Sequence, residues 1–172
     1  MEMKCLGGIL IVVGCLGVGI WFRMQYVHKL FVIKECCKGL SLLQGEIQYG
    51  RTPLPEACYL VAKRTKGSCH KLFFQVGQQL EKGSDSTEHI WQEKMIQIMN
   101  QQEMKAQDRE EMLRLGNTLG YLDLELQYKT LELCIQRLED SRDSYEREKR
   151  NRMRLYPMVG TFAGLLLCLV LV

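Results

Sequence analysis

The sequence predicts an all-α protein, an antiparallel bundle of about six helices flanked by a transmembrane helix at each end. Three observations predict this class. Charged residues are missing from both ends of the chain, and apolar residues recur at three- and four-residue steps through the middle. No stretch combines period-two alternation with β-branched residues. Because 172 residues suffice for one domain with a core but hardly for two, we expect a single domain between two membrane segments.

Both ends of the chain are long and apolar enough to span a bilayer. Residues 5–22 and residues 155–172 contain no Asp, Glu, Lys, Arg or His. At about 1.5 Å per helical residue each segment covers about 27 Å, close to the hydrocarbon thickness of a membrane. Residues 1–4 are then a short N-terminal end, and residues 23–154 form the domain between the spans.

The positive charges predict the orientation of this domain. Only Lys4 precedes the first span, and a dense basic run stands before the second. By the positive-inside rule the domain faces the cytoplasm and both termini lie outside. Eight cysteines at irregular spacing agree with a reducing compartment, and a net charge of +3 is too small to indicate nucleic-acid binding. The basic run consists of Arg147, Lys149, Arg150, Arg152 and Arg154.

The first span is predicted to continue into the domain as one long helix that ends near Tyr49 and Gly50. Thr52 is expected to cap a short second helix, with Pro53 in its first position, where a missing N–H costs nothing. This second helix runs to about Arg64. The apolar residues expected on the core side of the first helix are Val27, Leu30, Ile33 or Phe31, Cys37, Leu40, Leu43 and Ile47.

Two further helices follow. Gly67 opens the third, which stops at Lys82 and Gly83, and residues 84–86 supply the caps of the fourth. Their apolar faces predict burial within the bundle. The predicted core residues are Leu72, Phe73, Val76 and Leu80 in the third helix, and Ile90, Trp91, Met95, Ile98 and Met99 in the fourth.

A polar linker over residues 100–107 precedes a fifth helix over residues 108–119, with Gly116 and Gly120 marking its end. The last helix starts near Asp123 and runs into the second span. The predicted core residues are Met112, Leu113 and Leu119 in the fifth helix, and Leu124, Tyr128, Leu131, Ile135 and Leu138 in the last.

No pattern indicates catalysis. The histidines at 28, 70 and 89 are scattered, and none has a partner at the four-residue spacing of a helical metal site. Cys69 and His70 are adjacent, but neighbouring helix residues point about 100° apart and rarely bind one metal together. No phosphate loop, nucleophile elbow or dinucleotide fingerprint is present. We therefore expect no enzyme, no metal and no cofactor.

Small residues predict helix packing within the membrane. Gly160 and Gly164 form a small-xxx-small pair in the second span, and the first span holds Gly14 and Gly17 among its glycines. Such residues let transmembrane helices approach closely, so the two spans are expected to pack first against each other. The alternative is that glycine is merely tolerated there.

The N-terminus carries a competing signal. Residues 12–15, VVGC, resemble the small-residue site that precedes the lipidated cysteine of bacterial lipoproteins. Cleavage before Cys15 would place the domain outside the cell as a structural lipoprotein. Apolar residues continue to Phe22 and the basic flanks favour the opposite topology, so the uncleaved span is the preferred interpretation.

Several separated motifs extend over nearly the whole chain. The central motif is EIQYGRTPLPEA at residues 46–57, followed by LGNTLGYLD at residues 115–123 and by Gln127. A glycine-rich opening at residues 3–15 and GTFAGLLL at residues 160–167 lie toward the two ends. In their sequence and their order these motifs resemble the stage III sporulation protein AB family of endospore-forming bacteria.

The resemblance implies a protein of the mother-cell membrane, in the channel complex that joins mother cell and engulfed forespore and is needed for late forespore gene expression. It also implies a cytoplasmic domain similar to the six-helix bundle of the inner-membrane platform proteins of type II secretion and type IV pilus systems. By that analogy the partners are a hexameric secretion-type ATPase of the same operon and other membrane proteins of the complex. Platform proteins carry two such domains and more spans, which leaves homo-oligomerisation open.

The turn between the first two helices is the candidate partner contact, through Glu46, Tyr49, Arg51 and Glu56. An ordered, proline-rigid polar loop can present such side chains to an ATPase, whose conformational cycle the two long helices would pass to the membrane. The alternative is that the glycine and prolines merely build a tight connection. A membrane-anchored adaptor for some other soluble partner, not coupled to an ATPase, is a further alternative.

Overall fold

The structure is a computed structural model of the whole chain. It divides into two compact units, the bundle unit of residues 29–143 and the terminal unit of residues 1–28 and 144–172. The backbone description leaves out residues 1, 84, 100–102, 121–123 and 172, and the side-chain description further leaves out residues 2–13, 15–16, 18–20, 22–23, 124 and 149–171.

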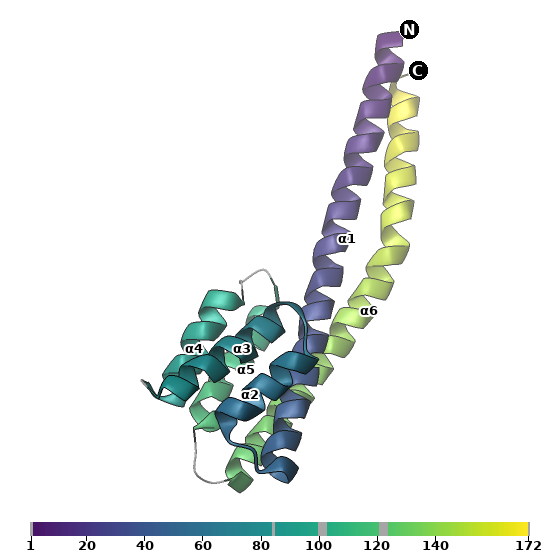
Figure 1. Cartoon of the computed structure of the whole chain (residues 1–172). Coiled ribbons are helices and arrows are strands. Elements are labelled where there is room, and N and C mark those ends of the chain that lie inside the picture. Colours follow the sequence, from purple (N-terminus) through teal and green to yellow (C-terminus); the bar gives the residue numbers. More distant parts are fainter. Residues whose placement is uncertain (1, 84, 100–102, 121–123, 172) are drawn as a thin grey trace. The chain divides into compact units, whose positions relative to one another are not determined.

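Helices account for nearly all of the described backbone, and no strand occurs in it (Figure 1). The prediction of an all-α protein with six helices is confirmed. The elements are α1 (Glu2–Gly45), the π-helical turn η1 (Glu46–Gly50), α2 (Leu54–Arg64), α3 (Gly67–Lys82), α4 (Thr87–Ile98), α5 (Ala106–Leu119) and α6 (Leu124–Leu171).

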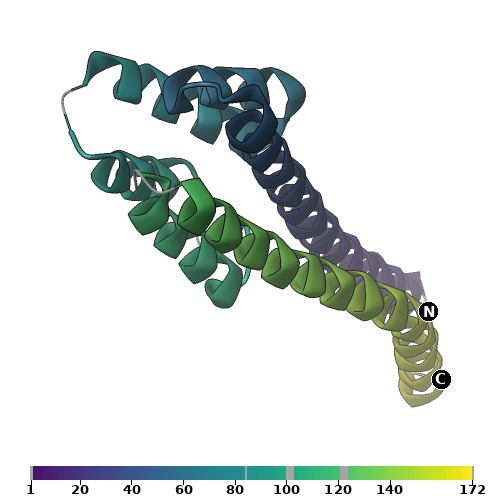
Figure 2. The same cartoon turned by 90° about the horizontal axis from the view of Figure 1, so that it is seen from below.

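Within the bundle unit the short helices pack in chain order, α2 on α3, α3 on α4 and α4 on α5 (Figure 2). Short loops join each of these pairs, so neighbouring helices run antiparallel. Polar contacts tie them to the two long helices. The backbone N–H of Lys66 donates to the Glu35 carboxylate of α1 at 2.7 Å, and the Gln127 amide of α6 donates to the carbonyl of Leu119 at 2.8 Å.

Trp91 lies in the centre of the bundle core. It is fully buried, its Nε1 donates to the carbonyl of Met112 at 2.6 Å, and its ring meets Phe73 edge to face at 5.7 Å. Gly116 was predicted to mark the end of the fifth helix, and this is wrong. Gly116 lies inside α5, where a Cβ would come within 2.8 Å of Trp91 Cδ1, so the glycine is there to admit the indole.

The predicted helix ends are partly right. Ser86 caps α4 as expected, accepting from the backbone N–H of His89 at 3.3 Å. Gly83 ends α3 in the left-handed conformation that favours glycine. Thr52 does not cap α2, which Pro53 precedes directly, because the Thr52 hydroxyl donates instead to the Glu46 carboxylate.

Burial departs from the predicted faces at the edges of the apolar stripes. Met104 is buried although it lies in the predicted polar linker, and α5 begins at Ala106, earlier than expected. A periodic pattern identifies the centre of a buried face, whereas neighbouring helices decide how wide that face is. The predicted core residues that are only partly buried are Leu80, Ile98, Leu113 and Tyr128. Val27 is exposed, and of the two alternatives Ile33 is buried and Phe31 exposed. The side chain of Leu124 lies outside the described residues.

In the terminal unit, Tyr26 of α1 meets the buried Tyr145 of α6 edge to face at 6.0 Å. Within the described part of the chain, none of the helices combines the length and apolar character that a bilayer crossing needs. Residues 5–22 and 155–171 of the two predicted spans are helical, but most of their side chains lie outside the described residues. The two spans therefore stay predictions, and so do the domain limits derived from them.

The glycines predicted to pack the spans are only partly covered. Gly14 and Gly17 are exposed, and a Cβ built on either meets no described heavy atom within 4 Å. No close packing accompanies them in the described residues. The side chains of residues 160 and 164 lie outside the described residues, and their packing role stays a prediction.

Candidate functional site

The connection from α1 to α2 is a closed turn rather than a loose loop. At η1 the helix widens to π-helical bonding, and Arg51 then takes a left-handed conformation with φ of 47°. The backbone N–H of Thr52 donates to the Glu46 carbonyl at 3.2 Å and closes the turn. A Cβ on Gly50 would come within 2.7 Å of the Thr52 hydroxyl oxygen, so a larger residue here would have to displace that hydroxyl.

Glu46 holds this turn together from inside. Its carboxylate accepts from the Thr52 hydroxyl at 3.2 Å and lies 3.9 Å from the guanidinium of Arg64. The ion pair is long and Arg64 is exposed, so the hydroxyl contact is the more informative of the two. Glu46 therefore has a structural use within the turn.

A cleft of about 470 Å³ opens beside the turn, within the bundle unit. Its walls come from η1 and the start of α2, from the start of α4, from the end of α5 and from the first turn of α6. Its volume lies in the range of natural ligand pockets, about 300–1,000 Å³. The lining residues are Ile47, Arg51, Thr52, Pro53, Leu54, Thr87, Leu119, Gly120 and Gln127.

Gln127 is a buried, hydrogen-bonded residue of the cleft lining. Only 5% of its surface is exposed, and its amide nitrogen donates to the carbonyl of Leu119, the last residue of α5. This bond satisfies one of the carbonyls that a helix end leaves without a partner. It also joins α5 to α6 directly next to the cleft.

The structure separates the predicted contact residues. Arg51 lines the cleft, whereas Tyr49, 82% exposed, and Glu56 face solvent without lining it. Thr87 and Leu119 line the cleft but were not predicted as site residues from the sequence. Leu119 belongs to the second motif, which is a usable signal, but nothing in the sequence connects Thr87 to the turn.

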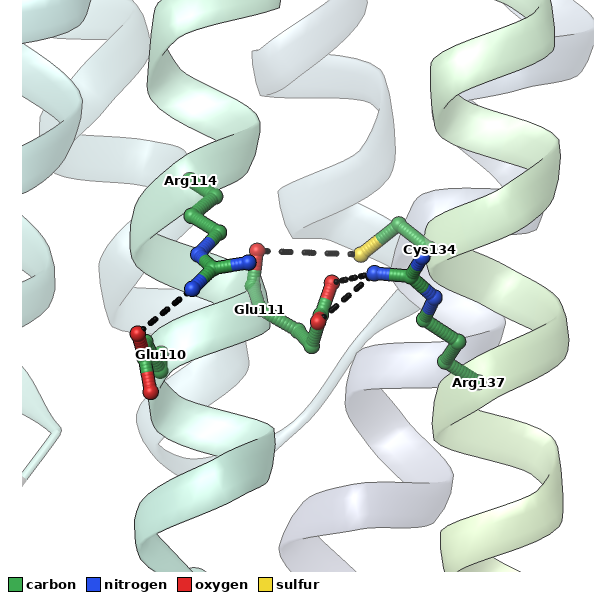
Figure 3. A network of polar contacts seen from close by, with 5 residues as sticks. All are labelled: Glu110, Glu111, Arg114, Cys134 and Arg137. Carbon is green, nitrogen blue, oxygen red and sulfur yellow. Dashed lines mark hydrogen bonds and ion pairs between the residues drawn. The ribbon is translucent and has the colours of Figure 1, made fainter.

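A second polar network lies between α5 and α6 (Figure 3). Nη1 of Arg137 lies 2.7 and 2.8 Å from the two carboxylate oxygens of Glu111. Beside it Arg114 pairs with Glu110 at 2.7 Å along α5, and the thiol of Cys134 is 4.0 Å from the Glu111 carbonyl. The contacts lie on a partly exposed face, where they stabilise the packing of α5 on α6 rather than form a reaction site.

The buried thiols are poor nucleophiles. Burial raises the pKa of Cys37, Cys58 and Cys134 to about 12. A hydrogen bond with Cys69, together with burial, raises the pKa of the Cys36 thiol. Since the thiolate is the reactive form, these side chains act as small core residues. No group of three metal-binding side chains occurs among the residues that the structure describes.

Fold and cleft together define a class: a small helical-bundle protein whose candidate site is a binding cleft between helix ends. The profile of stage III sporulation protein AB matches residues 4–172 of the chain. The Bacillus subtilis (strain 168) protein "Stage III sporulation protein AB" is 31% identical over 169 residues, which cover 98% of this chain and 99% of the relative. A solved structure of stage III sporulation protein AB matches with a TM-score of 0.67 and 30% identity, over 72% of this chain and 98% of that one.

The chain belongs to the stage III sporulation protein AB family, a family of sporulation proteins. The resemblance drawn from the sequence motifs is thereby confirmed, as is the helical fold that it implied.

Proposed function

We propose that the protein is a non-enzymatic platform of the channel complex between mother cell and forespore. Anchored in the mother-cell membrane with its bundle in the cytoplasm, it binds a hexameric secretion-type ATPase of the same operon. It passes the ATPase cycle to other membrane proteins of the complex. The family assignment supports a sporulation role, and the cleft supports a binding role.

One observation carries the binding role. The motif at residues 46–57 is far in the sequence from the motif at residues 115–123 and the nearby Gln127, yet both regions contribute to the lining of the same cleft. A motif needed only for a tight helix connection would not have to meet the other two. Their convergence on an open, lined space favours recognition of a partner at this place.

Membrane attachment rests on the apolar ends of the chain. Residues 5–22 and 155–172 carry no charge, and basic residues follow the first and precede the second. Trp21, with 56% of its surface exposed, stands at the inner end of the first predicted span. Tryptophan is enriched at the boundary between membrane and water, which supports a span ending there.

Binding of the purified ATPase to the full chain in detergent micelles tests the platform role. The double variant Arg51→Ala, Glu56→Ala is expected to weaken binding by about tenfold, as loss of a charge at an interface typically does. Lys63→Ala, which removes an exposed charge on α2 outside the cleft, is the matched control and should bind normally. Failure of the unaltered chain to bind the ATPase would remove the proposed coupling.

A second experiment tests the orientation. Asp85 is exposed in the loop before α4, and Asp85→Cys gives a thiol for a membrane-impermeant maleimide in intact and permeabilised sporulating cells. Burial raises the pKa of Cys58 and Cys134 and keeps these two thiols slow, and the chain without the added cysteine measures the background from all eight native thiols. Labelling only after permeabilisation is expected. Labelling of intact cells would place the bundle outside and end the ATPase proposal.

A further inference from the structure

Among the described residues, the charge of the cleft lining is one-sided. Arg51 is the only charged residue of that described lining, which includes no acidic side chain. The Arg51 backbone N–H donates to the Glu46 carbonyl, but its side chain makes no hydrogen bond or ion pair with the described residues and is exposed. Two acids are equally near in sequence: Glu46 is already engaged with Thr52 and Arg64, and Glu56 does not line the cleft. The guanidinium is therefore available to an anion brought from outside.

The neighbouring helix ends add to this positive character. Leu54 and Thr87, the first residues of α2 and α4, both line the cleft. The N-terminus of a helix carries a partial positive charge and N–H groups that lack partners within the helix. Each first turn also carries an exposed acid outside the lining, Glu56 in α2 and Glu88 in α4, which offsets part of this charge. The helix ends alone therefore define no site, and the positive character of the cleft rests on Arg51.

The rest of the lining is largely apolar. Ile47, Pro53, Leu54 and Leu119 form most of the wall around the charged group. A cleft with apolar walls and one cation is complementary to a carboxylate that arrives together with apolar side chains, and its volume accommodates several of them. A lone hydrated anion would leave this apolar surface in contact with water.

We propose that the cleft receives an extended segment of the partner protein in which one Asp or Glu stands beside apolar residues, with Arg51 pairing with that carboxylate. This inference deepens the platform function and rests on it for the identity of the partner. Arg51 also keeps a left-handed backbone that glycine or asparagine would adopt at less cost, as is found at binding sites.

Photocrosslinking of the full chain in sporulating cells tests the occupant. A benzoylphenylalanine in place of Thr87 lies in the cleft wall, and the same residue in place of the exposed Gln78 of α3 is the control. A crosslinked peptide that contains Asp or Glu next to apolar residues is expected from the first position only. Overturning results are an adduct yield no higher than at position 78, or a crosslinked peptide without a carboxylate, including an adduct with lipid.

Charge variants decide whether Arg51 does the pairing. Arg51→Glu is expected to lower the adduct yield by at least about tenfold, whereas Arg51→Lys retains most of it. Lys63→Glu makes the same charge change on α2 outside the lining and should leave the yield intact. If Arg51→Glu lowers the melting temperature, Arg51→Gly removes the charge and fits the left-handed backbone. An unchanged yield in a folded charge-removing variant overturns the proposal.

Reversal of the partner's acid provides the final step. Lys in place of the crosslinked Asp or Glu should restore the yield in the Arg51→Glu chain. The outcomes also separate the two proposals. A carboxylate peptide from a protein other than the ATPase supports the cleft inference and contradicts ATPase coupling, whereas ATPase binding that is insensitive to Arg51→Glu supports the platform function and contradicts the cleft inference.

Discussion

The surroundings of Trp91 and the surroundings of Arg51 differ in how completely the bundle fills its own space. Trp91 is fully buried, and its surroundings are so closely packed that even the Cβ of an alanine at position 116 would have no room. Around Arg51 the turn is equally well defined, yet it closes on itself through Glu46 and Thr52 and leaves a cleft beside it. The helices thus fill the space around Trp91 completely, whereas they leave an open cleft beside Arg51.

This difference separates stability from binding. A substitution in the filled region removes contacts that hold the native state together, so it changes the free energy of unfolding. Arg51 at the cleft has a side chain without a partner among the described residues, so its substitution is expected to change affinity while the bundle stays folded.

The largest effect is expected at the indole itself. Trp91→Ala removes a fully buried aromatic ring and the hydrogen bond to the Met112 carbonyl, which should lower the free energy of unfolding by about 3–5 kcal/mol. Denaturant unfolding of the full chain in detergent measures it. The chain has two tryptophans, and Trp21→Ala, at an exposed position, should cost within about 0.5 kcal/mol. Equal losses from both variants would contradict the contrast.

Thiol reactivity tests the openness of the cleft directly. A cysteine at the cleft wall, Thr87→Cys, should react with a small disulfide reagent at pH 8 about 100-fold or more faster than the native core thiols. Burial raises the pKa of Cys58 to about 12, so its thiolate stays scarce at that pH. Both chains carry Cys5→Ser, Cys15→Ser and Cys168→Ser, so that the chain without the added cysteine gives the rate of the core thiols. Similar rates for both would mean that the cleft is closed in solution.

The turn should respond more mildly. Gly50→Ala places a methyl group against the Thr52 hydroxyl and displaces it from Glu46, at a cost of about 1 kcal/mol in the free energy of unfolding. In a Thr52→Ala background the same change should cost less, because the hydroxyl is gone. A double-mutant cycle measures the coupling, and strict additivity would show that the two residues act separately.

The smallest effect has the opposite sign. Arg51→Gly removes the strain of a left-handed backbone conformation that a residue with a side chain disfavours. Glycine loses more conformational entropy on folding, so we expect a net stabilisation of up to about 1 kcal/mol. The same variant should bind the partner more weakly, because it lacks the cation of the cleft. Thermal unfolding and ATPase binding, measured on one preparation, test whether stability and function diverge at this residue.

Much of the fold could be predicted from the sequence because helices and their ends depend on patterns of neighbouring residues. The apolar period of 3.6 residues identified the helices, and Ser86 and Gly83 were recognised as helix ends because capping depends on neighbouring residues. Gly116 was misread for the same reason. A glycine near a helix end looks like a terminator, and only its contact with Trp91, which comes from another helix, reveals its use.

The candidate site could be predicted in part. Arg51 was selected because a rigid polar turn can present a side chain, and the structure places it on a cleft. Glu46 was selected with it, although the carboxylate is used within the turn. Thr87 could not be found, because its place opposite the turn depends on how α4 packs in the bundle.

The sequence by itself determined the helical class, the order of the helices, the apolar ends and the family to which the chain belongs, since periodicity, caps and motifs are properties of short segments. The tertiary structure decided which segments meet. It brought the two central motifs and Gln127 to one cleft. It also left the side chain of Arg51 without a partner among the described residues. Contacts between residues far apart in the chain arise from helix packing, and a single sequence does not record them.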